Sequence, residues 1–373
     1  MNKTENYYEH KLIFACACLE MSDSAQNEIR KFLAVPLNWN EIIDISNRHQ
    51  ILPFLYFNLN KLNFGTIIPR DIFMIMQNCY FSNILKNSLI EEEISFILQL
   101  SNRENINVIP FRGFSLIQTL YHNLGLRIMV DVDILAKNKD SERINNILTQ
   151  LKYLGYAEEN ITVFTKIISP NLNLVIEVHY ALAPCRPYKI NLPSLWERTQ
   201  QITFNKLSLT CLSEEDTFLS LALHLRRHTR RITLKMVIDI AELLNANMSK
   251  LDWLYIIKSA KDNRIISTVY FSLYIIKELF DATVPSKIFN EFRPNIIKIT
   301  LIHFCINKSN FFLLKKWQGA FLRLLLCDKP IDFLLYLWRV SFLERFVTKH
   351  CFKKYKENIT EIMPRDTKLK IKK

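Results

Sequence analysis

Three carboxylates stand at positions from which they could share metal ions. Asp131 and Asp133 are two residues apart in an apolar run, and Glu177 lies in a later apolar run. If both runs are strands, side chains two apart point to the same side. An acid in an apolar strand is costly to bury without a partner, which makes Glu177 a natural third ligand. Because two-metal phosphoryl transfer needs such carboxylates, we predict that all three bind metal and act in catalysis.

A glycine turn precedes the two aspartates. The chain has only five glycines, and Gly113 lies between a predicted strand over 106–111 and a predicted helix over Phe114–Leu124. Ser115 follows at the head of that helix, where backbone N–H groups can donate to phosphate oxygens. The turn and the carboxylates together predict a site for a metal-bound triphosphate.

The order of these motifs resembles a known superfamily. G-F-S, an arginine, D-V-D-I-L-A and a later E-V-H-Y look like the polymerase-β-type nucleotidyltransferases. Within them, the chain resembles an uncharacterised bacterial family with a Lys-Gly start, a Tyr in the next helix, an Arg, then Asp-x-Asp. Residues 39–53, 223–228 and 237–244 extend the resemblance over most of 12–255. The family's lysine is Arg112 here, which keeps the charge but changes its hydrogen-bonding shape.

The resemblance implies a role for each matching residue. The chain would use Mg²⁺ (or Mn²⁺) and take an NTP as substrate. Asp131 and Asp133 would bind both ions, and Glu177 would complete the catalytic metal site and help to deprotonate the acceptor. The residues expected at the nucleotide end are Arg112, Gly113, Ser115 and Arg127. Arg127 would contact a phosphate or the acceptor, or else orient Asp131.

Further residues are candidates for the acceptor end or for supporting the metal ligands. They are His179, His228, Arg227 and Asp239. His179 shares a strand face with Glu177, so it orients that acid, touches the acceptor or is merely structural. His224 and His228 are four apart on one predicted helical face, but a zinc site needs further ligands, and a supporting or core role is favoured. The arginine-rich segment 226–231 is either an anion-binding patch or a solvated helix end, and Asp239 is expected to pair with one of its arginines.

Apolar periodicity divides the chain into four regions. They are an N-terminal helical domain (1–104), an α/β core (105–212), a C-terminal helical domain (213–352) and a basic tail (353–373). The core is predicted to contain strands over Ile128–Ala136, Ile161–Ser169 and Leu172–Tyr180, a helix from Ser141 to Gly155, and a hairpin over Ile202–Leu212. The fold class is therefore α+β: a small mixed-sheet, polymerase-β-like nucleotidyltransferase core flanked by helical domains.

Composition narrows the class of protein. Of the 373 residues, 49% are hydrophobic and 12% aromatic, which excludes a disordered chain. The net charge of +13 favours an anionic partner, although generic solvated lysines are slightly preferred as its explanation over a dedicated nucleic-acid surface. The eight cysteines include no C-x-x-C pair and are expected as buried thiols in a reducing cytoplasm. Neither a signal peptide nor a membrane span is predicted.

Three functions follow as alternatives. The first is a metal-dependent enzyme that transfers NMP from an NTP to a small molecule, peptide or protein and releases pyrophosphate. The second is the same chemistry on tRNA, as in toxin-like nucleotidyltransferases; the basic residues motivate this nucleic-acid partner, which is not favoured. The third is a non-catalytic binding or scaffold protein that keeps the fold, which the Arg112 departure leaves open and the three intact acids argue against.

Overall fold

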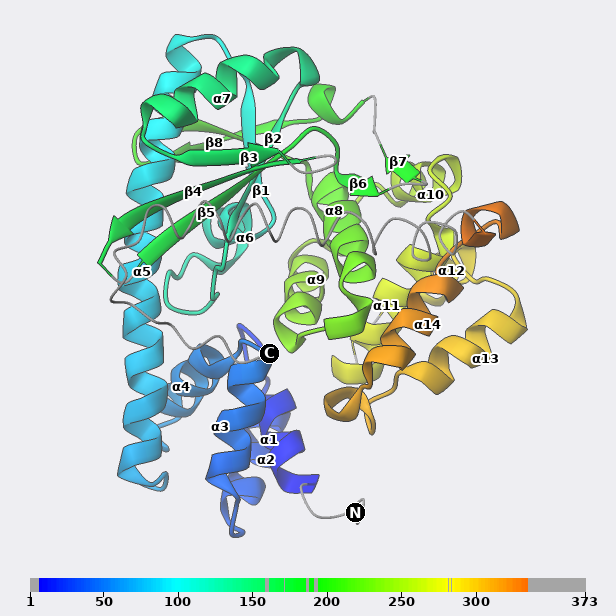
Figure 1. Cartoon of the computed structure of the whole chain (residues 1–373). Helices are drawn as coiled ribbons and strands as arrows, with labels where there is room; N and C mark the ends of the chain where they lie inside the picture. Colours follow the sequence, from blue (N-terminus) through cyan, green and yellow to red (C-terminus); the bar gives the residue numbers. More distant parts are fainter. Residues whose placement is uncertain are drawn as a thin grey trace.

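The computed structural model describes residues 7–157, 161–170, 172–185, 188–190, 194–280, 282 and 284–334 (Figure 1). The predicted basic tail lies outside these residues, as does the end of the predicted C-terminal helical region. Within the described ranges, no helix is both long and apolar enough to cross a membrane.

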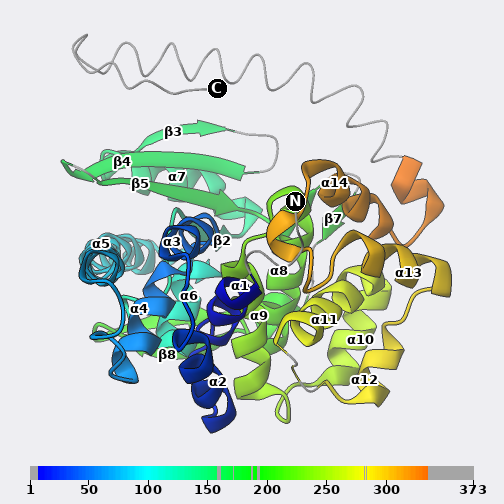
Figure 2. The same ribbon diagram turned by 90° about the horizontal axis from the view of Figure 1, so that it is seen from below.

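The N-terminal region is helical, as its periodicity predicts. Its helices are α1 (Tyr7–Ala15), α2 (Asp23–Leu33), α3 (Trp39–Arg48), α4 (Leu52–Lys61) and α5 (Arg70–Arg103). Asn38 begins α3 by accepting a hydrogen bond from the Glu41 backbone N–H. At 34 residues, α5 is long enough to pack beside α4 with one half and beside the sheet with the other (Figure 1). Seen from below, α1 and α2 lie between α5 and the C-terminal helices (Figure 2).

A five-stranded mixed sheet forms the centre of the core. Its order is β1-β2-β5-β4-β3, and only the β2–β5 pair is parallel. The strands are β1 (Val108–Phe111), β2 (Val132–Ala136), β3 (Leu154–Ala157), β4 (Ile161–Ser169) and β5 (Leu172–His179). Two short hairpins follow, β6 (Ala183–Cys185) with β7 (Tyr188–Ile190) and β8 (Gln200–Phe204) with β9 (Leu207–Cys211). The sheet thus places β2 directly beside β5.

The two faces of the sheet have different neighbours because side chains alternate along each strand. One face packs with α7 (Ser141–Gln150), the end of α5 and the β8–β9 hairpin in one hydrophobic cluster. That face contributes Val132, Ile134, Ile176 and Val178. The other face contributes Phe111 and Leu135 to a second cluster, which also contains residues of the N-terminal and C-terminal helices. This second face is the one from which Asp133, Glu177 and His179 project.

The C-terminal region is a packed set of helices. They are α8 (Glu214–Arg227), α9 (Leu234–Asn247), α10 (Trp253–Asp262), α11 (Ile266–Phe280), α12 (Ser286–Glu291), α13 (Ile296–Cys305) and α14 (Lys316–Leu325). Ser213 caps α8 by accepting from the Asp216 backbone N–H. A Cβ added to Gly319 would lie 2.1 Å from the Thr229 carbonyl oxygen, so α14 is seated closely against the turn that follows α8.

The fold class is confirmed: a small mixed sheet lies at the centre of an α+β chain with helical regions before and after it. Three local predictions were wrong. The helix after Gly113 comprises α6 (Gly113–Leu116) and a π-helical turn (Ile117–Tyr121), and it ends there because His122 takes a left-handed conformation. The predicted strand over Ile128–Ala136 begins only at Val132. Gly155 lies in strand β3, where a Cβ would meet the Phe164 ring at 2.5 Å. The domain boundaries remain predictions.

Candidate active site

Strand register brings together residues that are distant in the sequence. In the parallel β2–β5 pair, Asp133 stands opposite Glu177 and Leu135 opposite His179. Because alternate residues share a face, Glu177 and His179 point to the side from which Asp133 projects. One potential ligand atom from each of Asp133, Glu177 and His179 lies within 4.8 Å of the others. The sheet itself therefore positions a compact group of two carboxylates and one imidazole.

His179 links the two carboxylates. Its Nε2 lies 2.7 Å from Asp133 Oδ1 and 3.3 Å from Glu177 Oε2. The ring is fully buried and packs edge-on against Phe111. Its Nδ1 has no hydrogen-bond partner among the described residues. Carboxylate oxygens suit Mg²⁺ and Mn²⁺, whereas an imidazole ligand suits zinc, copper, iron or nickel. The donor set therefore fits a divalent cation, with Asp133 and Glu177 as its first ligands.

Arg112 is anchored inside the protein. Its guanidinium donates to Asp133 Oδ1 at 3.1 Å, to Ser220 Oγ at 3.3 Å and to the Leu182 carbonyl at 2.8 Å. The residue is buried and has a φ of 55°, so the positive φ at this turn belongs to Arg112 and not to Gly113. Such a backbone is strained for an arginine, and the three hydrogen bonds hold it in place.

The pKa values of both acids in this group are lowered by their neighbours. Burial opposes the charge on Asp133, but Arg112 and His179 outweigh it and hold the pKa of this carboxyl well below its usual range. Burial likewise opposes the Glu177 charge, and the hydrogen bond from His179 nevertheless lowers the pKa of Glu177. Both acids are therefore held as carboxylates, the form that binds a cation.

Asp131 lies just before β2 and outside the compact group, yet within its electrostatic field. Burial raises the pKa of Asp131, and the charges of Asp133 and Glu177 raise it further. Lys235 and Arg127 act in the opposite direction. Three acids thus concentrate negative charge at the start of β2, an arrangement that a divalent cation stabilises.

The predicted nucleotide-end residues are enclosed. Gly113 is buried, and a Cβ there would lie 2.5 Å from Arg127 Nη1, so the glycine makes room for that guanidinium. Ser115 is also buried, and its side chain lies near the Cys211 thiol. Its role, like that of Gly113, remains a prediction.

Arg127 and Asp239 form a buried ion pair. Arg127 donates from Nε to Asp239 Oδ1 at 2.9 Å and from Nη2 to Oδ2 at 2.8 Å. The Tyr121 hydroxyl also donates to Oδ1, at 2.7 Å. The expectation that Asp239 pairs with an arginine of 226–231 was wrong, because α9 turns this acid towards the loop before β2. The partner of Arg127 is therefore a residue of α9 that lies 112 positions further along the chain.

The end of α8 faces the same acids. The His224 and His228 rings lie 4.5 Å apart. Burial and the nearby Arg227 lower the pKa of His228 to about 4, while Glu177 partly offsets them. Burial also lowers the pKa of His224, with Asp133 acting against it. Arg227 in turn favours the charged form of Glu177. Two neutral imidazoles and one arginine thus lie within electrostatic range of Asp133 and Glu177.

A polar face of α5 holds the loop that leads to Asp131, although no sequence motif indicates it. Asn83 donates to the carbonyls of Leu124 and Gly125, and Asn87 to those of Leu124 and Arg127. The two asparagines are four apart in an otherwise apolar helical stripe, a spacing that could have singled them out. They satisfy carbonyls that would otherwise be buried without partners.

Two lysines reach the same loop, and no sequence motif indicates them either. Lys86 of α5 donates to the Met129 carbonyl at 2.6 Å, and Lys235 of α9 donates to the Ile128 carbonyl at 2.9 Å. In the sequence, Lys235 stands four residues before Asp239 among apolar residues, which places both on one helical face.

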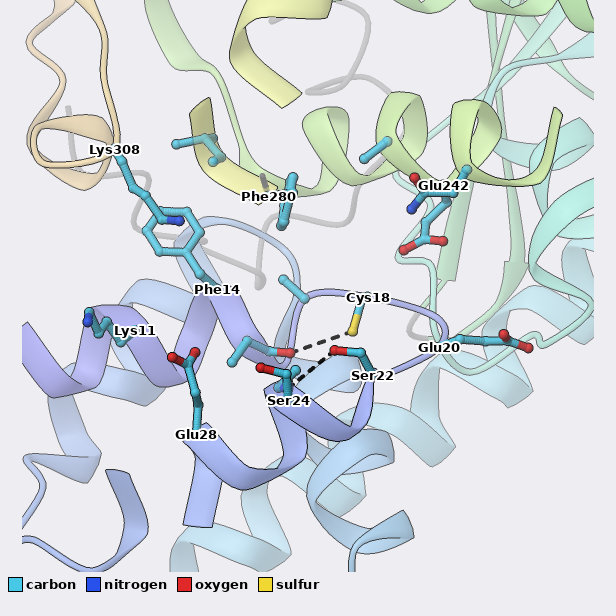
Figure 3. Close-up of a pocket in the computed structure, with 16 residues that line it drawn as sticks. Lys11, Phe14, Cys18, Glu20, Ser22, Ser24, Glu28, Glu242, Phe280 and Lys308 are labelled. Carbon is cyan, nitrogen blue, oxygen red and sulfur yellow. Dashed lines mark hydrogen bonds between the residues drawn. The ribbon is translucent and has the colours of Figure 1, made fainter. Parts of the chain in front are cut away.

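Two pockets lie away from the group of Asp133, Glu177 and His179. One of about 580 Å³ opens between α1, α2, α9 and α11, with Phe14 and Phe280 on its apolar walls (Figure 3). A neighbouring one of about 730 Å³ includes Tyr121 in its lining. Glu20, Glu242 and Asn245 belong to both. Neither pocket contains a residue of the carboxylate group.

Comparison with known proteins identifies the family of this chain. A family model described as an uncharacterised nucleotidyltransferase matches residues 36–281, which is more than half of the chain. The chain belongs to this family, as the resemblance predicted. Among curated proteins, no match is found. A solved structure described as an antigenic nucleotidyltransferase-like protein from Paracoccidioides brasiliensis is similar at 15% identity and a TM-score of 0.35. The alignment covers 55% of this chain and 98% of that one.

Proposed function

We propose that this protein is a metal-dependent nucleotidyltransferase that moves NMP from an NTP to an acceptor and releases pyrophosphate. The observation that carries the proposal is the placement of Asp133 and Glu177 side by side on parallel strands, with Asp131 immediately before the first of them. Membership of a nucleotidyltransferase family supports the same reaction class. The proposed acceptor is a small molecule, a peptide or a protein.

The reaction forms one bond and breaks another at the α-phosphorus. An oxygen or nitrogen of the acceptor bonds to that phosphorus, the bridging oxygen to the β-phosphorus leaves with pyrophosphate, and the acceptor's proton is lost. Divalent ions held by Asp131, Asp133 and Glu177 would neutralise phosphate charge and lower the pKa of an acceptor hydroxyl. Glu177 is the carboxylate proposed to take the proton.

The surrounding residues keep this group in one geometry. A proton on His179 Nε2 is shared between Asp133 Oδ1 at 2.7 Å and Glu177 Oε2 at 3.3 Å, which holds the two carboxylates close to each other. Arg112 donates to Asp133 Oδ1, the same oxygen that His179 contacts. We assign these two residues a positioning role, since positioning and charge neutralisation supply most of the catalysis in phosphoryl transfer.

The experiment measures transfer from each α-labelled NTP, with Mg²⁺ or Mn²⁺, to small molecules, peptides, proteins and tRNA. Asp131→Asn, Asp133→Asn and Glu177→Gln should each reduce transfer by more than about a hundredfold. Glu142→Gln, an exposed acid on α7 of the same core, is the matched control and should retain full transfer. The assignment is refuted if each of the three variants still transfers NMP at the wild-type rate.

The tRNA alternative is tested in the same assay. It was motivated by the arginines of segment 226–231, but Arg226 is buried and donates to Thr268 and Cys327. One of the four arginines is therefore part of the helical packing. Labelling of tRNA in preference to other acceptors would establish this alternative. Absence of nucleotide binding with either metal would favour the non-catalytic scaffold.

A further inference from the structure

Two lysines from different helices meet at the loop that precedes Asp131. Lys86 and Lys235 donate to adjacent carbonyls, those of Met129 and Ile128. Lys86 lies on α5 and Lys235 on α9, so only the tertiary structure places them together. Each is close enough to Asp131 for their charges to interact.

Neither lysine ammonium group has an acceptor for each of its N–H donors among the described residues. A lysine has three N–H donors. In the part of the chain that the structure describes, each Nζ has one acceptor, a backbone carbonyl, and neither forms an ion pair within 4.0 Å. Lys235 is only 7% exposed, so water satisfies its remaining donors poorly. A buried ammonium with two free donors is costly unless a ligand provides acceptors.

The local charges identify the kind of ligand. Arg127 lies beside Lys235, and its Nη1 occupies the space beside Gly113, 2.5 Å from where a Cβ of that residue would stand at the predicted phosphate turn. Burial and the Arg127 charge lower the pKa of Lys235 to about 7, while Asp239 and Asp131 act against them. Lys86 adds a further positive charge, and burial lowers its own pKa. An anion with several oxygens relieves this crowding of cations and fills the free donors.

We propose that Lys86 and Lys235 bind the β- and γ-phosphates of the NTP, on the side of Asp131 away from Glu177. This inference rests on the proposed function and extends it by assigning the residues that hold the leaving pyrophosphate. Asp131 would then stand between the carboxylate group and the lysine pair, facing metal-bound phosphate oxygens. Carbonyls of Ile128 and Met129 hold both ammonium groups ready for that contact.

The test compares ligands that differ only in their phosphates. Binding of a nonhydrolysable NTP, the corresponding NMP and inorganic tripolyphosphate is measured by calorimetry with Mg²⁺ on the full chain. Lys235→Met and Lys86→Met should each weaken NTP and tripolyphosphate binding about ten- to a hundredfold and leave NMP binding unchanged. Lys235→Arg should restore most of the loss. Lys250→Met, an exposed lysine after α9, is the control and should bind as wild type does.

The outcomes separate this inference from the proposed function. If wild-type protein transfers NMP, but both Lys→Met variants bind NTP and tripolyphosphate with wild-type affinity, the lysine site is refuted and the reaction stands. Equal losses for NTP and NMP would also refute it, because they indicate a structural role. If the wild-type protein binds tripolyphosphate through the lysines but transfers nothing, the anion site stands and the proposed reaction fails. Lys86→Met, at the less buried position, decides the question if Lys235→Met does not fold.

Discussion

The buried Arg127–Asp239 pair allows a quantitative test of what holds α9 against the core. The side chains are 6% and 2% exposed, and Asp239 accepts three hydrogen bonds, two from Arg127 and one from Tyr121. Removing one partner of such a pair leaves an uncompensated buried charge and costs about 3–5 kcal/mol of unfolding free energy. We expect the cost of Asp239→Asn to lie at the upper end of this range, because the N–H₂ group of the new amide would face the donors of the Arg127 guanidinium.

The two partners should show strong coupling. Arg127→Met leaves the Asp239 charge buried and should cost a similar amount. The double variant Arg127→Met/Asp239→Leu removes both charges and replaces them with apolar groups. Because a well-packed apolar pair is often as stable as a buried ion pair, we expect the double variant to be more stable than either single variant.

Urea unfolding measures these free energies. Circular dichroism and tryptophan fluorescence should give coincident transitions for each variant before the free energies are compared. Glu291→Gln is the control, because its pair with Lys261 is 3.7 Å long and about half exposed; such a pair contributes about 0–1 kcal/mol. Single substitutions at Arg127 and Asp239 that cost less than about 1 kcal/mol would refute the reasoning, as would costs that simply add in the double variant.

Three further outcomes follow from individual residues. Gly113→Ala should destabilise the fold by about 1–3 kcal/mol, because its Cβ would meet the guanidinium of Arg127, which is fixed by its ion pair. Gly65→Ala is the control and should cost less, because its Cβ would meet the edge of the half-buried Phe73 ring at 3.2 Å. Equal urea midpoints for the two variants would contradict this prediction. Arg112→Lys should also cost about 1–3 kcal/mol, because one ammonium cannot reach all three acceptors of the guanidinium, and an unchanged midpoint would show that the family's usual lysine suffices. Burial lowers the pKa of His49 to about 4, and its neutral Nδ1 accepts from the backbone N–H of the first residue of α9. The contribution of His49 to stability should therefore be complete above about pH 6.5 and fall by about 3 kcal/mol towards pH 4, and His49→Asn should remove this part of the pH dependence in a urea series.

Local patterns predicted much of the framework. Strand alternation placed Glu177 and His179 on one face, and the β4–β5 hairpin and the caps at Asn38 and Ser213 were found where the residues indicate them. These features depend on neighbours within a few positions, so the residue order is enough to predict them. The helix after Gly113 was predicted too long, because its left-handed end at His122 has no glycine to mark it.

The partners within the site were much less predictable. Sequence spacing indicated three acids, but Arg112 as the partner of Asp133 and Asp239 as the partner of Arg127 depend on how distant elements pack. The asparagines and lysines of α5 and α9 carried no motif, although their polar character in apolar stripes was visible. A polar residue on such a stripe indicates that a partner exists without saying which one.

By itself, the sequence determined which residues could do chemistry and which strand faces they occupy, because alternation and capping are local properties of the chain. Tertiary structure decided that β2 lies parallel to β5, which brings Asp133 within hydrogen-bonding distance of His179. It also decided that Lys86 and Lys235 meet beside Asp131. These contacts join residues far apart in the chain, and they form only where the burial of whole faces outweighs the entropy of bringing those segments together.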